Sequence, residues 1–162
     1  SNMKIKFLVL LFIMSSCNTD LIGEIDINDL KKFPHKSWFV SEYDNYEPYD
    51  DTMEKLKPLI NKYEILLFMG TWCEDSQTHV PTFLKVINQL DFKNELRIIA
   101  VDLDKKTPTG IANNYEIDYV PTFIFVENGK EVNRIVEFPV DFMEDDILAI
   151  CKDNNYKNVY EL

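Results

Sequence analysis

The chain has 162 residues, of which 46% are hydrophobic and 28% are charged, a composition typical of one globular domain. Its formal net charge of −11 argues against nucleic acid as a partner, because phosphate binding needs a basic face. Three cysteines, Cys17, Cys73 and Cys151, form no disulfide framework and show no paired Cys/His spacing for zinc. We therefore expect neither a metal nor another cofactor.

The start of the chain resembles an export signal. The first two residues are set aside as the remnant of a tag. Lys4 and Lys6 form a short basic region before the apolar run Phe7–Met14. This run is too short to span a bilayer, which needs about 20 residues, but it fits the apolar part of a signal peptide. We therefore predict that residues 1–16 are a tag remnant followed by a signal peptide.

A cysteine follows this segment directly. Ser15-Ser16-Cys17 resembles a bacterial lipobox, in which the cysteine receives lipid and becomes the first mature residue. The alternative is an ordinary secretory signal followed by an unrelated cysteine. With lipid on Cys17, we expect an exported lipoprotein of the bacterial cell envelope that is anchored in a membrane and faces the periplasm.

The rest of the chain divides into three parts. Residues 17–36 are predicted to form a polar tether that ends in a short amphipathic stretch. Residues 37–151 are predicted to form the folded domain, and residues 152–162 a polar C-terminal tail.

Strand and helix signals alternate in the first half of the domain. Ser37–Glu42 (SWFVSE) is predicted to be the first strand. Thr52–Tyr63 has apolar residues at helical spacing, although Pro58 lies in its middle. Glu64–Met69 (EILLFM) is typical of a buried central strand, and Ser76–Leu90 again shows helical spacing.

The second half of the domain ends in a hairpin and a helix. A strand, a short helix, two strands and a helix are predicted, in that order, over Leu96–Leu103, Pro108–Tyr115, Thr122–Glu127, Glu131–Val136 and Phe142–Cys151. Asn128-Gly129 between the last two strands is a strong hairpin signal. The resulting order, β-α-β-α-β-α-β-β-α, indicates an α/β sandwich with a mixed sheet.

The segment between the central strand and the long helix carries the most specific signal. Its residues, Gly70-Thr71-Trp72-Cys73, resemble the active-site entry of the thioredoxin superfamily, in which a tryptophan precedes the nucleophilic cysteine. Pro81 follows Cys73 by eight residues, as the proline that kinks the family's helix does. Val120-Pro121-Thr122 stands where the family has a cis-proline segment beside the thiol. The chain is similar to this superfamily over roughly residues 37–151.

The resemblance implies a fold and a set of roles. The fold is an α/β thioredoxin-like three-layer sandwich, with a central mixed β-sheet flanked by helices. Cys73 would be the nucleophile at a helix N-terminus, with Trp72 before it. Ser76 lies one turn further on, where its hydroxyl can donate to the thiolate. The Val120–Thr122 segment would bind an extended substrate peptide by β-augmentation.

Three positions depart from the family pattern. Ser76 replaces the resolving cysteine, which releases a substrate from its mixed disulfide. Leu67 occupies the place of a buried acid, six residues before the nucleophile, that serves the second cysteine. Glu74-Asp75 replace the usual Gly-Pro, and their carboxylates oppose the negative charge that a helix N-terminus favours on the thiol. The motif W-C-E-D-S is similar to that of a bacterial subgroup of thioredoxin-like proteins with W-C-x-D-S.

Three further residues have two interpretations each. Cys151 is either a resolving thiol or a buried core thiol of the last helix, and we favour the core. His79 is either a base or a surface or packing histidine, and we favour the latter. Asp75 is either a proton relay or the N-cap of the long helix, and we favour the cap.

The function that these residues imply is monothiol thiol–disulfide exchange in the cell envelope. Cys73 would form mixed disulfides with substrate proteins or small thiols, and an external thiol would release them. Such an oxidoreductase or isomerase would act without a resolving cysteine on extended peptide or protein substrates. The alternative is a lipoprotein without catalytic activity, which uses the thioredoxin fold to bind peptides or to support assembly.

Overall fold

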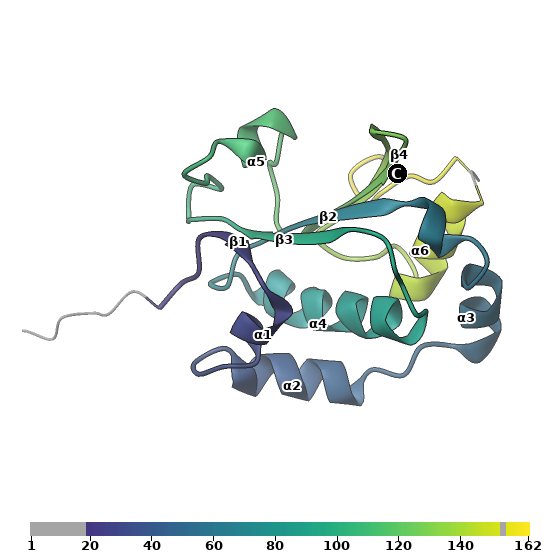
Figure 1. Cartoon of the computed structure of the whole chain (residues 1–162), viewed down its shortest axis with the longest axis horizontal. Coiled ribbons are helices and arrows are strands. Elements are labelled where there is room, and N and C mark those ends of the chain that lie inside the picture. The colour runs from purple at the N-terminus through teal and green to yellow at the C-terminus, as the bar shows by residue number, and fades with distance from the viewer. Residues whose placement is uncertain (1–18, 153–154) are drawn as a thin grey trace, which may run out of the picture.

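The computed structural model describes residues 19–152 and 155–162, in which one mixed sheet runs through the middle (Figure 1). Its strands are β1 (Gly23–Ile25), β2 (Glu64–Met69), β3 (Leu96–Ala100), β4 (Thr122–Glu127) and β5 (Lys130–Val136). They lie in the order β1-β3-β2-β4-β5, with β2 and β3 parallel and the other neighbours antiparallel. The mixed sheet predicted from the sequence is confirmed, while the predicted signal peptide and Cys17 lie outside the described residues.

Helices cover both faces of this sheet. They are α1 (Ile27–Leu30), α2 (Lys36–Asn45), α3 (Asp50–Leu56), α4 (Glu74–Gln89), α5 (Ile111–Asn114) and α6 (Met143–Cys151), with a 3-10 turn, η1 (Ile60–Lys62). Figure 1 shows α5 on one side of the sheet and α2 and α4 on the other. None of these helices has the length and apolar character needed to cross a membrane.

The sheet separates two hydrophobic cores. Successive side chains of a strand point to opposite faces, and β2 follows this rule. Ile65, Leu67 and Met69 pack in the larger core with α2, α4 and α6, whereas Leu66 and Phe68 pack in the smaller core near α5. The molecule is therefore the three-layer sandwich that the sequence predicts.

The segment predicted to be the first strand is a helix instead. Ser37–Glu42 lies inside α2, which packs against α4. Phe39 is buried, and the ring of Tyr43 stacks on it with the centroids 5.6 Å apart. A spacing of four residues places two side chains on one helix face. The aromatic and β-branched residues that favour a strand locally are thus overridden by packing on α4.

The predicted helix over Thr52–Tyr63 is divided in two. α3 ends at Leu56, and η1 follows after Pro58. Proline lacks the N–H that a continuing helix needs, and it restricts the residue before it. Pro58 therefore ends the helix rather than only weakening it.

The folded domain extends beyond both predicted boundaries. Within the predicted tether, β1 pairs antiparallel with β3, and Gly23 lies opposite Ala100. Beyond residue 151, Tyr156 packs against the larger core, and its carbonyl accepts a hydrogen bond of 2.9 Å from the Asn133 amide group on β5. Short segments that sequence reading leaves as tether and tail are thus parts of the sandwich.

Candidate active site

Cys73 lies at the end of the loop that joins β2 to α4. Its backbone is extended, with φ −94° and ψ 124°, so that Cys73 is the N-cap residue and α4 begins at Glu74. The Cys73 carbonyl accepts the first helical hydrogen bond from the amide of Gln77, at 2.9 Å. The thiol is half-buried at the positive end of a sixteen-residue helix, as the sequence predicts.

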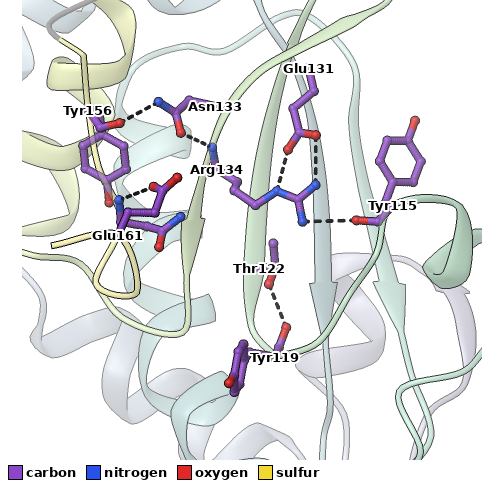
Figure 2. A network of polar contacts seen from close by, with 9 residues as sticks. Tyr115, Tyr119, Thr122, Glu131, Asn133, Arg134, Tyr156 and Glu161 are labelled. Carbon is purple, nitrogen blue, oxygen red and sulfur yellow. Dashed lines mark hydrogen bonds and ion pairs between the residues drawn. The ribbon is translucent and has the colours of Figure 1, made fainter.

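The cis-proline segment lies beside this thiol. The peptide bond between Val120 and Pro121 is cis, and the Cys73 thiol donates to the Val120 carbonyl with Sγ and O 3.3 Å apart. The Pro121 carbonyl accepts from the Glu137 amide at 2.7 Å. Thr122 donates its hydroxyl to the Tyr119 carbonyl at 2.7 Å (Figure 2). The fold thus brings together two motifs that are 47 residues apart in the chain.

Trp72 is fixed by its indole. Its Nε1 donates to the Val101 carbonyl, at 3.0 Å, at the end of β3. The ring lies over Gly70, where a Cβ atom would come within 2.5 Å of the indole Cε2. Glycine at position 70 is therefore required by the close approach of the tryptophan, which packs against the smaller core.

Ser76 has a different partner from the one expected. Its side chain is fully buried, and its hydroxyl oxygen accepts a hydrogen bond of 3.1 Å from the Gly70 amide. The predicted role, donation to the Cys73 thiolate, is therefore not the contact that the structure shows. Leu67, also fully buried, packs in the larger core. Ser76 holds the active-site loop against the helix.

The acidic and histidine candidates play structural parts. Asp75 is in the first turn of α4 and is not its N-cap, so that prediction is wrong. A carboxylate there stabilises the helix through the macrodipole. The His79 ring lies 6.4 Å from the ring of Phe138, and burial lowers the pKa of His79. The His79 ring is thus packed beside Phe138.

Cys151 is the buried core thiol that the sequence predicts. It is 4% exposed and packs in the larger core, whereas Cys73 packs against the smaller one. Burial raises the pKa of Cys151 to about 12. The sheet therefore lies between the two described cysteines.

The N-terminal segment supports the active-site loop through contacts that the sequence does not predict. The Thr71 hydroxyl donates to the Asp20 carboxylate at 3.2 Å and accepts from the Leu21 amide at 3.2 Å. Gln77 ties the other side of the loop, because its side-chain amide donates to the Thr71 carbonyl at 2.8 Å. No short motif marks the two contacts of the Thr71 hydroxyl, since they join residues about 50 positions apart.

A second missed feature is the C-terminal segment beside the cis-proline segment. The ring of Tyr160 stacks on Tyr119, with centroids 4.3 Å apart and an interplanar angle of 10°. Nearby, Arg134 forms a bidentate ion pair with Glu131 and donates to the Tyr115 carbonyl at 3.1 Å (Figure 2). A tail without hydrophobic periodicity gives no sequence signal for such a contact.

Across the part of the chain that the structure describes, no group of three acidic, histidine or cysteine side chains is placed to hold a metal.

Comparison with known proteins agrees with this architecture. The family model Thioredoxin matches residues 43–147. Thioredoxin Y of rice, a chloroplastic protein, is 34% identical over 89 residues, which are 55% of this chain and 48% of that protein. A thioredoxin H-type of Picea mariana is 28% identical over 52% of this chain and 63% of its own length. The chain thus spans about half to two thirds of these relatives.

A solved structure extends the similarity of fold. A protein of unknown function from Pseudomonas aeruginosa superposes with a TM-score of 0.62 at 19% identity, over 82% of this chain and 94% of that one. The matched family model includes the β2–α4 loop with Cys73 and the cis-proline segment that contacts it. This chain belongs to the thioredoxin family.

Proposed function

We propose that the protein is a monothiol thiol–disulfide exchange protein, with Cys73 as the nucleophile. The observation that carries the proposal is the placement of a half-buried thiol at the N-terminus of α4, in contact with the cis-proline segment. A helix N-terminus favours the thiolate, which is the reactive form. The other described thiol, Cys151, is buried in the opposite core.

The exchange needs no redox partner within the domain. After Cys73 loses its proton to solvent, its thiolate attacks one sulfur of a substrate disulfide. A new S–S bond joins Cys73 to the substrate, the old S–S bond breaks, and the second substrate sulfur leaves as a thiolate. With a serine at position 76, the reaction stops at this mixed disulfide. An external thiol releases the substrate by attacking the new bond, and Cys73 leaves as the thiolate.

The contact between Cys73 and Val120 couples the thiol to substrate docking. In the resting site the Val120 carbonyl accepts a hydrogen bond from the Cys73 thiol. When Cys73 is ionised or bonded to a substrate sulfur, this carbonyl loses its donor. A buried carbonyl needs a partner, so it becomes available to the N–H of an extended peptide. The Pro121 carbonyl already accepts a hydrogen bond from the Glu137 amide, and the Thr122 hydroxyl already donates to the Tyr119 carbonyl.

A disulfide peptide tests the proposal directly. The full chain with Cys17→Ser is incubated with a peptide disulfide and analysed by intact mass spectrometry and peptide mapping. We expect a stable adduct at Cys73 that a small thiol removes, because no resolving thiol competes. Cys151→Ser is the matched control and keeps the adduct, whereas Cys73→Ser loses it. Failure of Cys73 to form an adduct with any peptide disulfide would contradict the proposal.

The location that we propose for this activity rests on the N-terminal motif. We infer that Cys17 carries lipid and anchors an exported protein in the bacterial envelope, facing the periplasm. The support is the apolar segment before Ser15-Ser16-Cys17. Metabolic labelling with a lipid precursor should mark the wild-type protein and not Cys17→Ser. An unlabelled wild-type protein that partitions into the aqueous phase would contradict the inference.

A function without catalysis is the second candidate, and two buried residues favour it. Ser76 bonds to the Gly70 amide rather than to the thiol, and Leu67 offers no acid below the site. The protein would then bind peptides along the cis-proline segment without covalent chemistry. Cys73→Ala separates the two functions. It abolishes the exchange activity but leaves peptide binding intact if binding alone is the function.

A further inference from the structure

An exposed aromatic pair borders the approach to Cys73. Tyr119 immediately precedes Val120, whose carbonyl accepts the Cys73 thiol. Tyr160 stacks on Tyr119 in a nearly parallel arrangement, yet Tyr119 is 42% exposed and Tyr160 is 52% exposed. Two tyrosine rings therefore face solvent beside the segment where the proposed function places the substrate peptide.

Defined hydrogen bonds hold this pair in place. The Tyr160 hydroxyl donates to the Glu137 carboxylate, and the Tyr160 amide donates to the Asn158 side chain at 3.0 Å. The Glu161 carboxylate closes the same turn by accepting from the Asn158 amide at 2.9 Å. Upstream, the Tyr156 hydroxyl donates to the buried Asp146 carboxylate at 2.7 Å. The C-terminal segment is thus folded to present Tyr160 rather than resting on the surface by chance.

The surroundings of the pair carry negative charge. A cavity of about 200 Å³ beside the two rings is lined by the carboxyl residues Glu116, Asp118 and Glu161. The cation in the same lining is Arg134, which is already neutralised by its bidentate ion pair with Glu131 (Figure 2). The rings and the carboxylates therefore form a site that would attract a positively charged side chain.

The pair is also linked electrostatically to the helix that carries the thiol. The hydrogen bond to Glu137 is the main reason that the pKa of Tyr160 rises to about 12, and the Asp75 carboxylate adds to the effect. Asp75 lies two residues after Cys73, in the first turn of α4. A positive side chain held at the rings would thus lie within the field of Asp75 as well as Glu137.

We propose that the Tyr119–Tyr160 pair is a specificity site for a lysine or arginine side chain next to the disulfide cysteine of the substrate. Cations bind over the faces of tyrosine rings, and nearby carboxylates strengthen the attraction. A peptide extended along Val120–Thr122 would place a residue flanking its cysteine over the pair. This inference rests on the proposed exchange function and names the substrate class, polypeptides with basic residues beside the reactive cysteine.

Matched peptides test the inference in the full chain with Cys17→Ser. Each peptide carries one cysteine as a disulfide with 2-mercaptoethanol, and the peptides differ only in having lysine, glutamine or glutamate beside it. The measured quantity is the ratio of rate constants for peptide adducts at Cys73. We expect the lysine peptide to react roughly three- to tenfold faster than the glutamine peptide. The glutamate peptide should be the slowest, and 500 mM salt should reduce the differences.

Variants assign this preference to the pair. Tyr160→Leu and Glu137→Gln should each reduce the lysine-to-glutamate ratio at least threefold, whereas Tyr160→Phe should keep most of it because the ring face remains. Tyr49→Leu is the matched control, since Tyr49 is 55% exposed and packs edge-on against Phe142. It should leave the ratio unchanged. Circular dichroism verifies that each variant is folded.

Each possible result bears on one claim. Equal rates for the three peptides, with adducts present, would overturn the specificity site and leave the exchange function standing. A preference for lysine that survives in both Tyr160→Leu and Glu137→Gln would overturn the assignment to this pair. Absence of adducts with every peptide would instead overturn the exchange function on which the inference rests.

Discussion

Gly70 is a position where one hydrogen atom decides the geometry of the active-site loop. Its α-carbon lies under the Trp72 indole, and an added Cβ would meet the ring at 2.5 Å. The ring cannot move freely, because its Nε1 is bonded to the Val101 carbonyl. Trp72 therefore connects the loop to the end of β3 through a side chain with a fixed position.

Gly70→Ala is expected to lower the free energy of unfolding by about 1–3 kcal/mol, because the methyl group displaces the indole from its site. Urea denaturation of the variant measures this cost. In a Trp72→Ala background the same substitution should cost much less, since the clash is gone. Equal costs in the two backgrounds would show that the indole is not the obstacle.

Ser76→Cys tests the chemistry of the missing second thiol. The introduced thiol lies one helical turn from Cys73 and should attack the mixed disulfide, so that the peptide is released. Mass spectrometry should show the released variant two hydrogen atoms lighter than its reduced form, because a disulfide now joins positions 73 and 76. The wild type should keep the adduct. Ser76→Ala is the control and should keep it too. An adduct as persistent in Ser76→Cys as in the wild type would contradict this expectation.

Prediction from sequence works well at this scale where a motif specifies both partners. Trp72-Cys73 and Val120-Pro121 are found in contact because each matches a family segment of known placement. The partner of Ser76 escaped prediction, because the Gly70 amide is a backbone group that no residue type announces. The same reason hid the contact between Thr71 and Leu21.

Among the elements, α6 and the C-terminal segment are joined through one buried carboxylate. Asp146 accepts hydrogen bonds from the Val140 amide at 2.7 Å, the Asp141 amide at 3.1 Å and the Tyr156 hydroxyl at 2.7 Å. It is 2% exposed. Through Tyr156 it fixes the segment that carries Tyr160, so that the last helix and the aromatic pair are parts of one unit.

Asp146→Asn should destabilise the protein by about 1–3 kcal/mol, because one amide oxygen cannot replace two carboxylate oxygens for three donors. Burial raises the pKa of Asp146 above the ordinary value of 3.8. The folded protein then binds this proton more tightly than the unfolded chain does. Titration of Asp146 therefore lowers the wild-type free energy of unfolding as the pH rises from 3.8 through the folded-state pKa.

The difference in stability between wild type and Asp146→Asn should accordingly narrow as the pH rises through that window. Urea denaturation of both proteins over a pH series gives this difference. A difference that widens with pH would mean that Asp146 is stabilised in its ionised form. Thr52→Val is a suitable control, because Thr52 contacts the neighbouring Asp145 instead.

Helices and strands were predictable where hydrophobic periodicity and packing agree. The hairpin at Asn128-Gly129 and the long helix α4 follow from local signals, and both are found. α2 was misread because its aromatic residues favour a strand locally, while burial of Phe39 against α4 favours a helix. β1 has only three residues, too few for a period to be recognised.

For the molecule as a whole, the sheet keeps the two described thiols on different sides. Cys73 belongs to the smaller core and Cys151 to the larger. The sequence predicted burial of Cys151 from the apolar face of its helix, but the separate cores follow only from how α6 and the β2–α4 loop pack on the sheet. An internal disulfide would require the sandwich to open.

Oxidation with diamide in a Cys17→Ser background should therefore give a dimer linked through Cys73. Non-reducing electrophoresis should show this dimer in the Cys17→Ser protein with or without Cys151→Ser. It should show only monomer when Cys73→Ser is added. The thiol of Cys151, with its pKa near 12, should resist alkylation at pH 8 until the protein is unfolded. A compact monomer with a bond between Cys73 and Cys151 would contradict this account of the fold.

The contact of Asp20 with Thr71 also bears on how far the Cys73 thiol could reach from a membrane anchor. Asp20 touches the loop that ends at Cys73, and it follows Cys17 by three residues. A chain advances by at most about 3.5 Å per residue, so three residues span at most roughly 11 Å. With lipid on Cys17, Cys73 would search a two-dimensional layer at the membrane surface. Its encounters with substrates bound to the same membrane would then depend on their density per membrane area rather than on their concentration in a volume.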